Sequence, residues 1–172
     1  MTKESSENVS VLLSPQAQTY LQDLHSSWKL KLYFLKNLPS AWWWGFQIKT
    51  ATTLLTEVTI PYNWRTQNPF RSIYFAALAG AGELSTGILA NLARMSGGNI
   101  SMLVLEQRAE FLKKANSTIT FTCEDGGKVF ETVAAAIATR QPQTLTMLGI
   151  GKNSNGDVVA RIYITWTFKL RN

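Results

Sequence analysis

Residues 72–93 read SIYFAALAGAGELSTGILANLA, a long segment that is apolar and rich in small residues. A helix that is apolar nearly all round is a buried helix, so this segment predicts the central helix of the fold. Ser72 is a candidate cap at its start, and Gly97 and Gly98 are expected to end it after Arg94. One side of the helix carries mostly small residues that would let another backbone approach closely, at Ala76, Gly80, Glu83 and Gly87.

Glu83 is the only charged residue between Arg71 and Arg94, and it lies near the middle of this helix. A lone buried carboxylate costs several kcal/mol, so it needs a partner, water in a cleft, or a raised pKa. A general base or nucleophile has the same needs, which makes Glu83 a candidate catalytic residue. The alternative is that Glu83 pairs with an arginine or a backbone amide and fixes a dimer interface.

The remaining segments predict one domain over residues 13–172, after a flexible arm at residues 1–12. Ser14 and Pro15 begin an amphipathic helix over residues 15–37, with a break near Ser26 and Ser27. Residues 42–61 hold two strands by their alternation, and residues 128–139 have helical character. Four more strands are expected at 101–112, 117–123, 143–151 and 157–169. This order is an α+β pattern that fits several folds.

Composition narrows the possible functions. The 172 residues include 45% apolar and 16% charged residues, which is a globular balance. The net charge of +6 is spread without a polybasic block or a nucleic-acid motif, so we expect no nucleic-acid partner. A single cysteine, Cys123, and a single histidine, His25, exclude a disulfide framework and a cysteine-based zinc site. We find no signal peptide and expect a cytoplasmic protein without stable membrane insertion.

Residues 60–83, IPYNWRTQNPFRSIYFAALAGAGE, resemble the hotdog-fold acyl-CoA thioesterase superfamily of the phenylacetyl-CoA thioesterase-like type, most of all its uncharacterised members. That pattern has an Asn, a Gly, then His-Gly-Gly or similar, and an Asp or Glu nine residues after the His. Asn68 matches the Asn, and Glu83 follows nine residues after Tyr74, which stands in place of the His. Arg71 or a neighbour replaces the usual Gly. The resemblance extends over about residues 40–170, through GFQI at 45–48, RAEFLKKA at 108–115 and the closing strand at 157–168.

The resemblance implies a hotdog fold, in which a curved antiparallel sheet wraps around one long central helix, here with an extra N-terminal helix. It also implies hydrolysis of an acyl thioester, with Glu83 as base or nucleophile and Asn68 holding the water or the carbonyl. Amides near residues 73–75 would stabilise the oxyanion. Tyr74 either donates a hydrogen bond or is a packing ring, and Thr86 would orient the carboxylate or the water.

The same resemblance implies a homodimer, or a tetramer of dimers, with sites between subunits. No cofactor or metal is implied, since coenzyme A arrives as part of the substrate. The candidate substrate-binding residues are Arg71, Ser72, Ile73, Phe75, Arg108 and Lys113, together with Lys114. The basic side chains among them would contact the coenzyme A phosphates, although for each of them a solvated surface charge is the favoured interpretation.

Three other functions remain as alternatives. A non-catalytic acyl or lipid binder would use the same fold, and the missing Gly and His favour it. A structural dimerisation module is a further possibility. A hotdog dehydratase is disfavoured because its histidine partner is absent from the motif. The run Trp42, Trp43 and Trp44 predicts either a lid over an acyl tunnel, packing between helix and sheet, or contact with a membrane interface.

Overall fold

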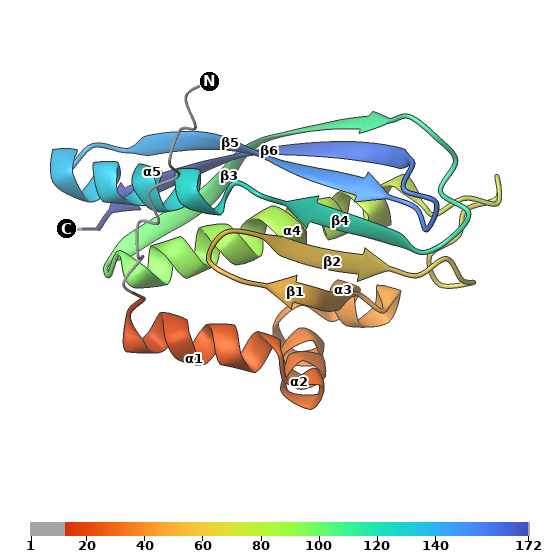
Figure 1. Ribbon diagram of the computed structural model, residues 1–172, viewed down its shortest axis with the longest axis horizontal. Helices are drawn as coiled ribbons and strands as arrows, with labels where there is room; N and C mark the ends of the chain where they lie inside the picture. Colours follow the sequence, from red (N-terminus) through yellow and green to blue (C-terminus); the bar gives the residue numbers. More distant parts are fainter. Residues whose placement is uncertain (1–12, 172) are drawn as a thin grey trace, which may run out of the picture.

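The computed structural model describes residues 13–171 as a curved antiparallel sheet with one long helix against its inner face (Figure 1). The expected arm at residues 1–12 lies outside the described residues. The six strands have the order β1-β2-β4-β5-β6-β3. The helices are α1 (Pro15–Leu24), α2 (Ser27–Asn37), α3 (Pro39–Trp44), α4 (Phe75–Ser96) and α5 (Gly126–Thr139). The strands are β1 (Gln47–Ala51), β2 (Thr56–Ile60), β3 (Ile100–Phe111), β4 (Ile119–Cys123), β5 (Gln143–Lys152) and β6 (Val158–Leu170). The predicted hotdog fold is confirmed.

The central helix α4 begins later than the sequence indicated. Its N-cap is Tyr74, and Ser72 does not cap it. The Ser72 hydroxyl instead accepts a hydrogen bond from the Ala115 amide at 3.0 Å, and the Ile73 amide donates to the Ala115 carbonyl at 2.7 Å. These bonds tie residues 72 and 73 to the loop after β3, and the helix starts only at Phe75.

The predicted N-terminal helix is two helices that break at the expected place. The Ser14 hydroxyl accepts from the Ala17 amide at 3.2 Å and caps α1, and α2 begins at Ser27. The start of the first strand was predicted too early, because residues 39–44 form the short helix α3. Pro39 suits the first turn of a helix, and Gly45, with φ of 73°, ends it in the left-handed conformation.

The core forms where α4 lies against the sheet, most closely at Gly82. A Cβ atom at Gly82 would lie 2.5 Å from a carbon of Ile162 on β6, and one at Gly149 on β5 would lie 3.0 Å from the Gly82 carbonyl oxygen. The close backbone approach therefore involves Gly82, and not the side carrying Gly80, which faces the rings of Trp44 and Phe46. By length and composition α4 could cross a membrane, but the sheet encloses it as the core helix.

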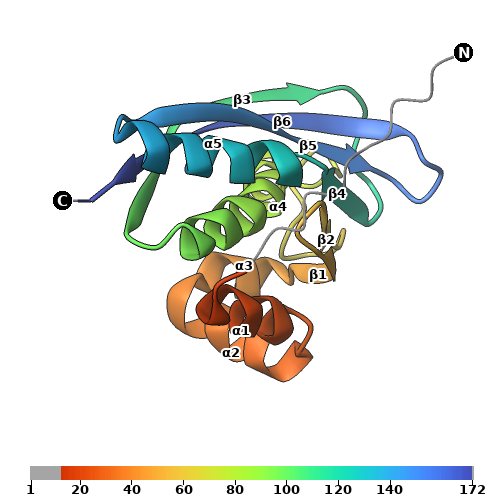
Figure 2. The same cartoon turned by 60° about the vertical axis from the view of Figure 1, so that its left-hand side comes forward.

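The helices α1 and α2 lie on the other side of α4 from the sheet, as the turned view shows (Figure 2). The Ser14 hydroxyl donates to the Met95 carbonyl at 3.0 Å, which ties the start of α1 to the end of α4. The His25 Nε2 atom lies 3.1 Å from the Ala51 carbonyl oxygen, so the junction between α1 and α2 is held to β1. Together with the sheet, these two helices enclose the middle of α4.

The contact at Gly82 gives a stability prediction. We expect Gly82→Ala to lower the free energy of unfolding by about 1–3 kcal/mol, because the methyl group overlaps Ile162 in a packed core. The matched control is Gly127→Ala in α5, where no atom lies within 4 Å of the added carbon. Urea unfolding of both variants checks this, and equal stabilities would contradict the packing described.

Candidate active site

Glu83 projects from the middle of α4 into a cavity of about 270 Å³, here named the inner cavity. The inner cavity lies between α4, the helices α1 and α2, and the sheet, and it has openings to solvent. Among residues 13–171, no side chain or amide forms a hydrogen bond or ion pair with the Glu83 carboxylate. Burial raises the pKa of Glu83 above its ordinary value of 4.5. A desolvated carboxyl group that still reaches a cavity can accept a proton from a bound water.

The polar contacts of Thr86 lie within the protein. Its hydroxyl donates to the Glu83 carbonyl oxygen at 2.9 Å and accepts from the indole N–H of Trp166 at 3.1 Å. Thr86 is fully buried, so it positions Trp166 against α4 beside Glu83. Within one chain, the Thr86 hydroxyl forms no hydrogen bond with the Glu83 carboxylate. Its predicted role in orienting the carboxylate or a water therefore stays a prediction.

Three residues that the sequence did not suggest surround Glu83 in the inner cavity. Trp166 of β6, Tyr20 of α1 and Asn91 of α4 all line it. Burial raises the pKa of Tyr20 to about 12, so its hydroxyl stays protonated. Asn91 could have been found from sequence, because it lies eight residues after Glu83 on one face of the helix. Tyr20 and Trp166 come from elements far away in the chain and give no local signal.

The start of α4 offers backbone donors, but not those predicted. The Ile73 amide donates to Ala115, and the Tyr74 amide donates to the Thr66 carbonyl oxygen at 2.7 Å. Of the amides of residues 73–75, only that of Phe75 has no acceptor within the described part of the chain. The amide of Ala76, the next one along, is equally unbonded there. Two orphan N–H groups at a helix N-terminus can stabilise a negative charge.

Asn68 organises the loop before α4. Its side-chain oxygen accepts from the Phe70 amide at 3.0 Å and from the Ser72 amide at 3.2 Å. This leaves its NH₂ group as the part that could hold a carbonyl or a water. Arg71 in the same loop has φ of 56°, a left-handed conformation that glycine adopts without strain. The glycine of the resembling pattern would suit this conformation, and the Arg71 side chain is exposed.

The ring of Tyr74 packs edge-on against that of Phe75, with centroids 4.8 Å apart. This contact favours the packing alternative for Tyr74, which is 44% exposed. Among the residues described, its hydroxyl has no hydrogen-bond partner. A role as donor to substrate stays a prediction.

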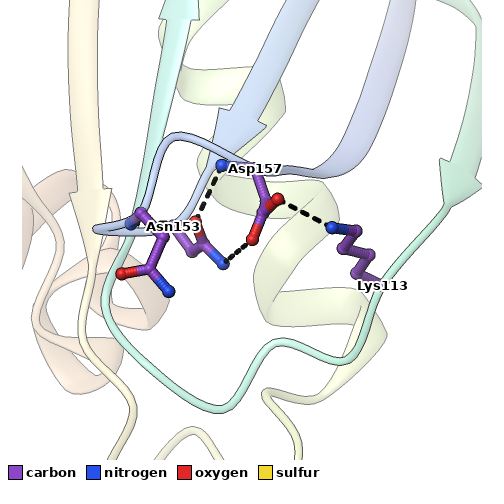
Figure 3. Close-up of polar contacts among 4 residues, drawn as sticks. Lys113, Asn153 and Asp157 are labelled. Atoms are coloured by element: carbon purple, nitrogen blue, oxygen red, sulfur yellow. Dashed lines mark hydrogen bonds and ion pairs between the residues drawn. The ribbon is translucent and has the colours of Figure 1, made fainter.

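Two of the predicted coenzyme A contacts are engaged in ion pairs. Lys113 donates to Asp157 at 2.7 Å, and Asn153 holds the same carboxylate (Figure 3). Lys113 beside it lowers the pKa of Asp157, although the pair is exposed and weak. Arg108 pairs with Glu110 and stacks 3.7 Å from the Tyr163 ring centroid.

The predicted site residues therefore form two groups in one chain. Asn68, Arg71, Ser72, Tyr74 and Phe75 gather at the start of α4, where Ala115 brings Lys113 and Lys114 close by. Glu83 lies eight residues after Phe75, so at 1.5 Å per residue its backbone is about 12 Å farther along the helix. One chain alone does not bring the two groups together. No group of three or more metal-binding side chains occurs within residues 13–171.

A family model described as Domain of unknown function (DUF4442) matches residues 27–168. The chain belongs to this family. The match runs from the start of α2 to residue 168 in β6, and so includes both groups of candidate residues of the DUF4442 protein. No curated protein matches the sequence.

Solved structures with the same fold are similar to the DUF4442 protein over most of its length. A protein from Pseudomonas aeruginosa, described as of unknown function and a probable thioesterase, has a TM-score of 0.71 at 17% identity, over 83% of this chain and 95% of its own. A thioesterase from Haemophilus influenzae has a TM-score of 0.58 at 14% identity, over 80% and 87%. A variant of a thioesterase enzyme from Staphylococcus aureus has a TM-score of 0.56 at 18% identity, over 73% and 94%. At these identities the likeness concerns the fold.

The raised pKa of Glu83 predicts a pH-dependent effect of Glu83→Gln on stability. Between the unfolded and the folded pKa, the folded wild type binds more protons than the unfolded chain, so it loses stability as pH rises through that window. We expect the variant to gain stability over wild type as pH rises above 4.5, and to show little gain below it. Urea unfolding across a pH series measures this difference, with Glu131→Gln on the exposed face of α5 as control. A pH-independent difference would contradict the desolvation of Glu83.

Proposed function

We propose that this protein is an acyl-CoA thioesterase that acts as a homodimer, with Glu83 as the general base. The observation that carries the proposal is a desolvated carboxyl group without a protein partner, on the core helix, open to a cavity. Proteins with this fold from three bacteria bear names that include thioesterase, which supports the reaction class.

In the proposed reaction, Glu83 removes a proton from a water as that water attacks the thioester carbonyl carbon. The carbonyl oxygen becomes negatively charged, and the free amides of Phe75 and Ala76 donate hydrogen bonds to it. The C–S bond then breaks, the thiolate leaves as coenzyme A, and the proton held by Glu83 passes to the sulfur. Attack by Glu83 itself, giving an anhydride that water then hydrolyses, is the alternative form of the same role.

The two halves of this site are supplied by different subunits in our proposal. In a symmetric dimer, the start of one α4 can lie beside the Glu83 of its partner. The separation of about 12 Å along α4 within one chain then no longer keeps the two groups apart. The edge strand β3 offers the surface for such pairing, because its outer backbone groups have no neighbouring strand within residues 13–171. Large apolar side chains lie exposed on this strand and at the start of α4: Leu103, Leu105, Phe111, Tyr74 and Phe75.

In the proposed function, Arg71 and Lys114 bind the coenzyme A phosphates. Neither has a carboxylate within ion-pair distance among residues 13–171, whereas Lys113 and Arg108 do. Arg71 lies four residues before the free amide of Phe75, so a phosphate bound there would accompany a thioester at the helix start. Lys113 and Arg108 keep the secondary role of exposed positive charges.

A non-catalytic acyl binder is the second candidate function. The observation that favours it is that the amides of Ile73 and Tyr74 are already used within the protein. Two amides remain at the helix start, and this is why we favour hydrolysis.

Glu83→Gln tests the proposed base directly. We expect hydrolysis of acyl-CoA to fall by roughly 10²–10⁴-fold, the contribution of a positioned general base. Release of free thiol from a panel of short, long and aromatic acyl-CoAs measures the rates, with Glu131→Gln as a matched surface control. If wild type turns over no member of the panel, the binder is favoured. If Glu83→Gln keeps wild-type rates, Glu83 is not the base.

A second prediction tests the Phe75 amide. Phe75 is the first residue of α4, and Tyr74 before it has φ of −61° and ψ of 133°, a conformation that precedes proline readily. Phe75→Pro thus removes one N–H while the helix keeps its start, and we expect a rate loss of about 10²–10³-fold.

Phe75→Ala is the matched control, since it removes the same ring and keeps the N–H. Circular dichroism verifies that both variants are folded. Equal rates for the two variants would show that the amide plays no part in hydrolysis.

A further inference from the structure

Beside the inner cavity lies a second cavity of about 510 Å³ between α1, α2 and the end of α4, here named the outer cavity. Tyr20, Leu24 and Tyr33 line both cavities, so the two adjoin. Both volumes are of the order of small-molecule sites in proteins, about 300–1,000 Å³. Together they make up the space between α1, α2 and α4, and Glu83 lines its inner part.

One face of α4 forms the floor of this space. Glu83, Gly87 and Asn91 line the inner cavity and Met95 lines the outer one, each four residues after the last. Residues at this spacing share one face of a helix, and the stripe is about 18 Å long. The missing side chain at Gly87 keeps the space open beside the carboxylate, because a Cβ there would lie 3.3 Å from Glu83 Oε1 and 3.4 Å from Trp166.

Few charged side chains line this space. Glu83 is the one charged side chain in the lining of the inner cavity. In the outer cavity, Asp23 and Lys29 form a partly exposed ion pair at 2.6 Å where α1 meets α2. The rest of the lining is mostly apolar and aromatic, including Leu30, which is 9% exposed. Such a lining suits a long apolar ligand with its reactive group at the Glu83 end.

We propose that the space between α1, α2 and α4 is the binding site for the acyl chain of a long-chain thioester, with Glu83 at its inner end. This proposal rests on the proposed function for its choice of reactive group. The stripe of about 18 Å is the length of an extended chain of roughly 15 carbons, at the spacing per bond of an extended polypeptide. The helices α1 and α2 therefore set the chain-length preference, by forming the wall opposite α4.

Binding of parinaric acid, a naturally fluorescent long-chain fatty acid, tests the site without hydrolysis. All variants carry Glu83→Gln in the full chain, so that the carboxylate of the probe does not meet a second one. Leu30→Trp fills the outer cavity, whereas Leu32→Trp places the same ring on the solvent side of α2, where Leu32 is 58% exposed. We expect Leu30→Trp to weaken binding by about tenfold or more, and Leu32→Trp by less than about twofold.

Leu30 is buried, so its variant can also disturb packing. Thr19→Trp and Gln22→Trp form a second pair on exposed positions of α1, where only Thr19 lines the outer cavity. We expect Thr19→Trp to weaken probe binding and Gln22→Trp to leave it nearly unchanged. This second pair tests the acyl site if Leu30→Trp does not fold. Failure of the Glu83→Gln chain to bind the probe, or equal binding within each pair that folds, would overturn the proposed acyl site. A third outcome is that probe binding differs within each pair as expected, while the wild-type protein hydrolyses no acyl-CoA. This result would support the acyl site and overturn only the thioesterase proposal.

Discussion

A carboxyl group in the middle of a core helix is the constraint on which the rest of this structure depends. Glu83 belongs to a helix that the sheet encloses, yet no residue among those described neutralises it. Its desolvation is tolerated because small residues and a cavity leave it access to water. Gly87 keeps that cavity open, and Thr86 and Trp166 close the wall beside it through a buried hydrogen bond. A fold that served stability alone would place an apolar residue at this position.

The same core helix also separates the two groups of candidate residues along its length. The helix must be long and apolar to fill the curved sheet, so its start and its carboxylate cannot be adjacent in one chain. The start offers two free amides and an exposed arginine, and the middle offers a carboxyl group. In the proposed function a second copy of the chain joins them, and β3 is the edge strand available for pairing. The helices α1 and α2 add a wall that the strands do not provide, and the space beneath them follows from that addition.

The sequence predicted the elements that depend on local patterns. The apolar run of α4, the alternation in the strands and the break between α1 and α2 all follow from residues close together in the chain. The start of α4 could not be predicted, because Ser72 is fixed by Ala115, 43 residues away. Helix α3 was missed because Pro39 reads equally as the end of one helix and the start of another. Glu83 stood out through its isolation, whereas Tyr20 and Trp166 meet it only once the sheet and the N-terminal helices are assembled.

Subunit complementation tests the central claim, which is that one site uses Glu83 from one chain and the Phe75 amide from its partner. Glu83→Gln and Phe75→Pro are each purified as nearly inactive homodimers, then mixed under conditions that exchange subunits, and acyl-CoA hydrolysis is measured. A mixed dimer holds one site with both groups intact, so this account predicts recovery of up to roughly a quarter of wild-type activity. If tagged chains show that mixed dimers form and yet no activity returns, the account of a shared site is contradicted.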